Sequence, residues 1–76
     1  MTAKLAVHYD RRADILSLTT RPPYPEQETE ELGDDIVARL NPTTGDVESL
    51  EILFFSKRVT GNSLELPVTA DFHRAR

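Results

Sequence analysis

The feature that most constrains the fold of this chain is the segment of residues 34–58, in which two apolar runs flank a turn sequence. The runs are residues 36–40 and 47–55. Residues 42–45, between them, have the composition of a turn, with proline at the entry and glycine at the exit. We therefore predict a β-hairpin. Because it holds most of the large apolar residues, we expect the core to be built on it.

The turn also predicts which residues face each other across the hairpin. With residues 42–45 as the loop, apolar residues face apolar ones and an arginine faces a glutamate. Apolar side chains then lie on both faces of the strands, so we expect the sheet to need cover on both sides, one from this chain and one from a partner. The predicted pairs are Leu40 with Val47, Arg39 with Glu48, and Val37 with Leu50.

Two more strands are predicted before this hairpin. Residues 4–9 largely alternate apolar and polar side chains, and Asp10 suits the turn that follows. Residues 14–20 form the second strand, with Ile15, Leu16 and Leu18 as its apolar residues. Residues 21–25 contain three prolines and are expected to be a stiff connector. The acidic residues 26–32 are predicted to be an exposed edge strand, where negative charge blocks unwanted strand pairing.

After the hairpin, Ser56 is predicted to cap a single helical turn that ends at Gly61. Residues 62–68 alternate apolar and polar positions and predict a last strand, which Pro67 places at an edge. Residues 69–76 are expected to be a frayed turn capped by Thr69, or a disordered tail.

The predicted fold class is therefore mainly β, a small antiparallel β-meander sheet with a short helical turn near the C-terminus. An α+β fold with a C-terminal helix on the sheet is the alternative. We expect one domain over residues 1–76, with its core in about residues 4–60.

Size and charge indicate a protein that associates. A chain of 76 residues is near the lower limit for independent folding, and it has no cysteine for a disulfide or a thiolate zinc site. Its net charge of −4 disfavours phosphate backbones. No apolar run is long enough to span a bilayer and no signal peptide is recognised, so we expect a cytoplasmic protein. Nucleic-acid association, the alternative function, would depend on Arg11, Arg12, Lys57, Arg58, Arg74 and Arg76.

No catalytic, cofactor or metal site is predicted. His8 and His73 stand alone in their segments, and no nucleophile motif or phosphate-binding loop accompanies them. Pro22 and Pro25 have the spacing of a PxxP ligand, but prolines in a connector more often shape the loop. The carboxylates lack the spacing of a calcium-binding loop and predict a solvated acidic face. These carboxylates are Glu28, Glu30, Glu31, Asp34 and Asp35.

Several short motifs occur in a familiar order: Tyr9-Asp10, Ala13-Asp14, Glu28-Thr29-Glu30, Asp35-Ile36-Val37, Leu50-Glu51-Ile52-Leu53 and Ser56-Lys57-Arg58. In these motifs residues 5–59 resemble the small, mostly bacterial family called domain of unknown function 2283. Of two glycines usual in the family, one is displaced to Gly33 and the position of the other is occupied by Ser49. The resemblance implies a compact antiparallel β domain with no established activity, and an antitoxin-like partner role is implied for such relatives.

We therefore predict a non-enzymatic protein-interaction module. It either forms a homodimer or binds a small basic protein, with no small-molecule substrate. Its acidic residues 26–35 would attract positive charge. The residues predicted to bind the partner are Leu50, Ile52, Phe54, Glu28, Glu30 and Glu31.

Overall fold

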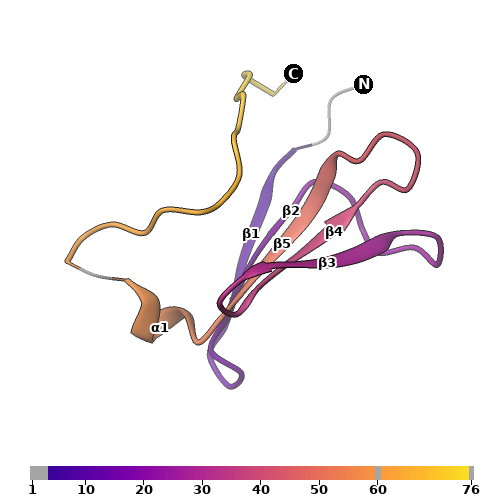
Figure 1. The fold of residues 1–76 in the computed structure, drawn as a ribbon. Helices are drawn as coiled ribbons and strands as arrows, with labels where there is room; N and C mark the ends of the chain where they lie inside the picture. The colour runs from indigo at the N-terminus through magenta and orange to yellow at the C-terminus, as the bar shows by residue number, and fades with distance from the viewer. Residues whose placement is uncertain (1–3, 60, 76) are drawn as a thin grey trace.

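The computed structural model describes residues 4–59 and 61–75, which form a five-stranded antiparallel sheet followed by one short helix (Figure 1). The predicted fold class, mainly β with a helical turn near the C-terminus, is confirmed. The acidic edge strand predicted at residues 26–32 is also found, as β3. The predicted turn at Asp10 is present, and the Asp10 carboxylate accepts hydrogen bonds from the backbone of Arg12 and Ala13. The elements are β1 (Ala6–Asp10), β2 (Ile15–Thr19), β3 (Glu28–Gly33), β4 (Ile36–Leu40), β5 (Val47–Leu53) and α1 (Phe55–Arg58).

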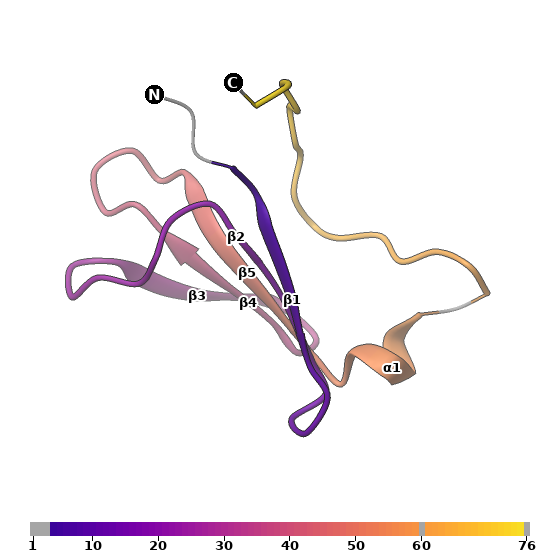
Figure 2. The same ribbon diagram turned by 180° about the vertical axis from the view of Figure 1, so that it is seen from behind.

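The strand order is β1-β2-β5-β4-β3, so β5 lies at the centre and β1 and β3 form the two edges (Figure 2). One hairpin, β1–β2, joins the three-stranded meander β3–β4–β5 through the β2–β5 pair. The proline-containing connector between β2 and β3 contributes no strand, because proline cannot donate to a ladder. The connector carries the chain to the far edge of the sheet, where β3 lies, so that β5 and not β3 pairs with β2.

The predicted hairpin register is correct only next to the turn. Leu40 faces Val47 as expected, but the other two predicted pairs are wrong. The register shifts there because Glu48 is one extra residue on β5, which forms a β-bulge. Beyond the bulge, Arg39 faces Ser49 and Val37 faces Glu51.

This one-residue shift exchanges the faces of β5. Leu50 and Ile52 join Ala38 and Ile36 on one face, where they form the core and are only 5% and 0% exposed. The opposite face of the central strands carries polar residues such as Arg39 and Glu51, which form an ion pair with a nitrogen–oxygen distance of 3.0 Å. The predicted assignment of Leu50 and Ile52 to the face opposite Ile36 and Ala38 is therefore wrong, while the opposite face keeps some apolar residues, such as Val37.

The apolar face consists of two rows of side chains that cross all five strands. Residues that face each other across a ladder lie on the same face, so the registers define these rows directly. Both rows begin at β1 and end at β3. The first row is Val7, Leu18, Leu50, Ala38 and Glu30, and the second is Tyr9, Leu16, Ile52, Ile36 and Gly33.

The C-terminal segment, residues 61–75, covers part of this apolar face. The predicted last strand is not present: apart from an isolated bridge at Ser63, these residues form no helix or strand. Their period-two residues Leu64, Leu66 and Val68 instead pack against the core. Pro67 has no backbone donor for a ladder, which is consistent with packing over the sheet rather than beside it. Figure 2 shows the segment returning along one side of the sheet toward the end at which β1 begins.

The helical turn is present but does not start as predicted. Phe54 occupies the N-cap position in the left-handed conformation, with φ of 54° and no side-chain cap. Ser56 lies inside the helix, and its hydroxyl donates to Asp14. The predicted end at Gly61 also differs, because α1 ends at Arg58. Thr60 and Arg76 lie outside the described residues.

Candidate functional site

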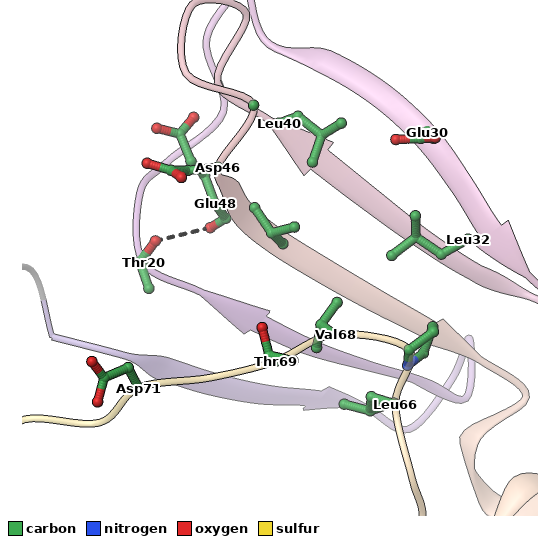
Figure 3. Close-up of a pocket in the computed structure, with 13 residues that line it drawn as sticks. Thr20, Glu30, Leu32, Leu40, Asp46, Glu48, Leu66, Val68, Thr69 and Asp71 are labelled. Carbon is green, nitrogen blue, oxygen red and sulfur yellow. Dashed lines mark hydrogen bonds between the residues drawn. The ribbon is translucent and has the colours of Figure 1, made fainter.

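A cleft of about 1240 Å³ lies between the apolar face of the sheet and the C-terminal segment. Its floor is apolar. Leu32 of β3 and Leu40 of β4 point into the cleft from the sheet, and Leu66 and Val68 approach from the other side (Figure 3). The four side chains also pack against the core, so the floor of the cleft is continuous with the interior.

The rim of this cleft is acidic. Glu30, Asp46, Glu48 and Asp71 line it (Figure 3), and no lysine, arginine or histidine is among the described residues that do so. A concave surface with charge of one sign concentrates the negative potential of a chain that already carries −4. The cleft therefore combines apolar contact area with attraction for a cation.

Glu48 is the best-anchored of these carboxylates. Its carboxylate oxygens accept hydrogen bonds from Tyr24 at 2.5 Å, Gln27 at 3.1 Å and Asn41 at 3.3 Å. The carboxylate also forms an ion pair with Arg21 at 3.4 Å. The hydrogen bond from the Tyr24 hydroxyl is the largest cause that lowers the pKa of Glu48, and it raises the pKa of Tyr24. The Arg21 guanidinium lies 4.3 Å from the centre of the Tyr24 ring.

These contacts tie the connector to the β-bulge. The backbone of Thr20 also donates to the Glu48 carbonyl at 2.9 Å. Since its carboxylate already has four donors, Glu48 shapes the wall of the cleft. Glu30, Asp46 and Asp71 are the carboxylates best placed to meet a ligand.

Asp14 makes a matching set of contacts at the opposite end of the sheet. It adopts φ of 57° after β1 and accepts from the Tyr9 hydroxyl at 2.6 Å, from the Ser56 hydroxyl at 2.6 Å and from the Ser56 amide at 3.0 Å. The Ser56 hydroxyl is the largest cause that lowers the pKa of Asp14, and the Tyr9 bond raises the pKa of Tyr9. The rings of Tyr9 and Phe55 also meet edge to face at 5.5 Å.

A second, smaller cavity of about 680 Å³ lies beside the first, near the start of β1. Leu5 and Leu18 line it from the sheet, and Val68 and Phe72 from the C-terminal segment. Phe72 is 79% exposed although it borders this cavity. The cover over the apolar face is therefore loose on its β1 side as well.

The structure separates the residues predicted to bind a partner. Leu50 and Ile52 belong to the core, whereas Phe54 is 49% exposed at the start of α1. The three glutamates all lie on β3 and are exposed, and Glu30 alone among them lines the cleft. The binding role of these residues stays a prediction.

Four of the described basic residues considered for nucleic-acid binding lie at one end of the sheet. Arg11 and Arg12 lie in the turn after β1, and Lys57 and Arg58 lie in α1, which Asp14 links to that turn. The turn before β4 is at the same end, because the Leu53 amide donates to the Asp35 carbonyl. Cations and carboxylates therefore lie at the same end of the sheet, the carboxylates being Asp10, Asp14, Asp34 and Asp35.

Sequence reasoning missed the part of the cleft that the C-terminal segment supplies. Leu66 and Val68 have the alternation of a strand, and nothing in that pattern distinguishes an edge strand from a cover over the face. Asp71 carried no signal. Glu48 was assigned to Arg39, and only the bulge shows that it binds the connector instead.

Among residues 4–59 and 61–75, no group of three or more histidine, aspartate or glutamate side chains is arranged to hold a metal ion. In the same residues, no helix has both the length and the apolarity needed to cross a membrane.

The fold and the cleft define a small single-sheet antiparallel β domain with an acid-lined groove on its apolar face. The chain belongs to the family described as Protein of unknown function (DUF2283), which matches residues 6–56. Neither a curated protein nor a solved structure gives a significant match. The family match covers all five strands and ends within α1, so the C-terminal wall of the cleft lies outside it.

Proposed function

We propose that this protein is a non-enzymatic interaction module that binds a basic, partly apolar segment of another protein in the cleft. One observation carries the proposal: an apolar floor of leucine and valine side chains is bordered by carboxylates with no cation among the described lining residues. A basic segment that alternates cationic and apolar side chains would cover the floor and neutralise the rim.

The apolar and charged contacts would contribute differently. Burial of leucine-sized side chains on the floor supplies most of the affinity, at about 25 cal/mol per Å² of apolar area before the cost of ordering. An exposed ion pair with Glu30 or Asp71 adds about 0.2–1 kcal/mol, so the rim selects the partner and accelerates encounter. This division supports an antitoxin-like role toward a small basic protein, which we include in the proposal.

A structural role accounts for each carboxylate and phenol whose pKa is shifted. Tyr24 and Glu48 bind each other at the bulge, and Tyr9 and Asp14 bind each other at the turn after β1. Their shifts follow from these hydrogen bonds, which hold loops in place. We therefore propose binding without catalysis, in the cytoplasm, where a chain with no cysteine needs no oxidising environment.

The proposal is tested by fluorescence anisotropy with two labelled peptides, one alternating lysine and leucine and one alternating glutamate and leucine. We expect the lysine peptide to bind saturably and the glutamate peptide not to bind. The double variant Glu30→Gln, Asp71→Asn should weaken it about fivefold, as two exposed ion pairs predict. Glu65→Gln is the matched control, because Glu65 is exposed on the same segment but does not line the cleft.

Two results would count against the proposal. Equal binding of both peptides would mean that the rim does not select charge. If Glu65→Gln lost as much affinity per removed charge as the double variant, the overall charge of the chain, and not the cleft, would attract the peptide.

A further inference from the structure

The two apolar rows of the sheet continue onto the edge strand β1 and end there in side chains that are exposed to solvent. Val7 and Tyr9 of β1 are 62% and 39% exposed, Leu5 just before the strand is 45% exposed, and all five residues of β1 are exposed. β1 pairs with β2 on one side, and no other described strand pairs with it. An edge of this kind, with apolar side chains and no proline or bulge, is a ready template for another strand.

We propose that β1 pairs antiparallel with β1 of a second copy of this chain, across a two-fold axis that passes beside Val7. The two sheets then form one continuous ten-stranded sheet. Because that axis is perpendicular to the sheet, both apolar faces lie on the same side. This inference goes beyond the proposed function, since it uses the edge opposite the acidic strand.

The argument for a second copy is self-complementarity. With Val7 facing Val7 of the copy, Ala6 faces His8 within β1. Pairing that extends to the two residues before the strand places Leu5 opposite Tyr9 and Lys4 opposite Asp10, and each of these pairs occurs twice by symmetry. Apolar residues meet on the core side and opposite charges meet on the other side. The first apolar row then runs without interruption from one sheet into the next.

Neighbouring registers are poorer. An axis beside His8 places the two histidines opposite each other and Ala6 opposite Asp10, so Lys4 loses its carboxylate partner. An axis beside Ala6 places Lys4 opposite His8, which brings like charges together whenever the imidazole is protonated. Charge therefore selects the register centred on Val7.

β1 is also held in position for this contact. The Tyr9 hydroxyl donates to Asp14 at 2.6 Å and its ring packs on Phe55, so its side chain is oriented before any partner arrives. A preorganised side chain loses less conformational freedom on association. The contact is still one short strand pair, and we expect a concentration-dependent dimer rather than a permanent one.

Disulfide trapping of the full-length chain tests the register directly, because the chain has no cysteine of its own. In Val7→Cys, the two thiols of a dimer would face each other at a separation that a disulfide can span. Leu5→Cys is the control for register, since Leu5 of the copy faces Tyr9 and so lies four residues away along the strand, roughly 13 Å. Glu30→Cys is the control for the other edge.

We expect Val7→Cys to form a covalent dimer at least tenfold faster than either control under mild oxidation, in proportion to protein concentration. Sedimentation velocity of the unmodified chain should show a dimer that Val7→Lys abolishes and Val59→Lys retains. Val7 and Val59 are both exposed, so both lysine variants should fold, which circular dichroism checks.

Three outcomes would overturn the inference: equal cross-linking of Val7→Cys and Glu30→Cys, a dimer that survives Val7→Lys, or a monomer at every concentration. Each leaves peptide binding in the cleft untouched, because Val7 does not line the cleft. Failure of the peptide experiment, in turn, leaves the cross-linking result valid.

Discussion

The two edges of the sheet, β1 and β3, belong to the same apolar face and differ in how that face ends. At β1 the rows of core side chains end in Val7 and Tyr9. At β3 the same rows end in Glu30 and Gly33, and the strand is further irregular between Glu31 and Gly33. Charges that point inward and a bulge are both devices that prevent strand pairing.

The difference indicates that the molecule blocks association at one edge and leaves it available at the other. Glu28 and Glu30 lie on the apolar face opposite Leu40 and Ala38, where an apolar residue would complete the core. Their position costs apolar burial at β3, which makes sense if this edge must stay unpaired. The predictions below test the centre that both edges share, then each edge in turn.

The largest effect is expected at the shared centre. Ile52 is fully buried on β5, between β2 and β4, and Ile52→Ala should lower the free energy of unfolding by about 2–5 kcal/mol. Urea denaturation followed by circular dichroism measures this. Val7→Ala, on the same face but exposed, should change the unfolding free energy of the monomer by less than about 0.5 kcal/mol. Similar losses in both variants would mean that β1 is not an exposed edge.

The bulge of β3 should depend on glycine. Gly33 has φ of 138°, and an added Cβ would meet no atom within 4 Å, so Gly33→Ala is strained by its backbone alone. We expect a loss of about 1–3 kcal/mol in urea denaturation. Gly45→Ala is the matched control, because its φ of 78° with equally open space should be less costly. If Gly33→Ala left the free energy of unfolding unchanged, the irregularity at Gly33 would not depend on glycine and would not explain the protection of this edge.

Acid should destabilise the loops at both ends of the sheet. The folded-state pKa values of Glu48 and Asp14 lie below their ordinary values of 4.5 and 3.8. The stability they contribute is present above those values and is lost as pH falls through the lower folded values. The raised pKa values of Tyr9 and Tyr24 act in the opposite range, so stability should also fall as pH rises above 10.0.

Thermal denaturation between pH 7 and pH 2 measures the acid effect. Glu48→Gln and Asp14→Asn should each flatten the fall of Tm below about pH 4.5, since neither amide titrates. Glu65→Gln, at an exposed position, should follow the unmodified chain. An unchanged acid limb in both loop variants would show that these hydrogen bonds do not set the acid stability.

The smallest effect is expected from opening the protected edge. In the double variant Glu28→Thr, Glu30→Thr, the inward charges are removed while the bulge at Gly33 remains. Sedimentation velocity should show a slight rise in species larger than a dimer at high concentration. If this variant associates as strongly as β1 does, charge alone protects β3. If it does not associate at all, the bulge is sufficient.

Local patterns predicted the elements well. Alternation identified β1, apolar residues after the Asp10 turn identified β2, the acidic composition identified β3 as an edge, and the proline and glycine at residues 42–45 identified the central turn. The reason is that each of these signals depends on residues close together in the chain. The fold class and the family resemblance could both be read at this level.

Position in three dimensions could not be read in the same way. One bulged residue, Glu48, reversed the faces of β5, and no residue type marks a bulge in a sequence. The alternation of Leu64, Leu66 and Val68 was compatible with a strand or with a cover, because both place every second side chain on the core. The cleft is lined both by the bulged Glu48 and by Leu66 and Val68 of the C-terminal segment, so the sequence alone did not predict it.

Amide hydrogen exchange, resolved by residue and repeated at two protein concentrations, tests the central claim most directly. The account predicts that protection of the outward-facing amides of β1 rises with concentration while the amides of β3 exchange at the same rate in both samples. Protection that rises on β3, or that rises on neither edge, would contradict it.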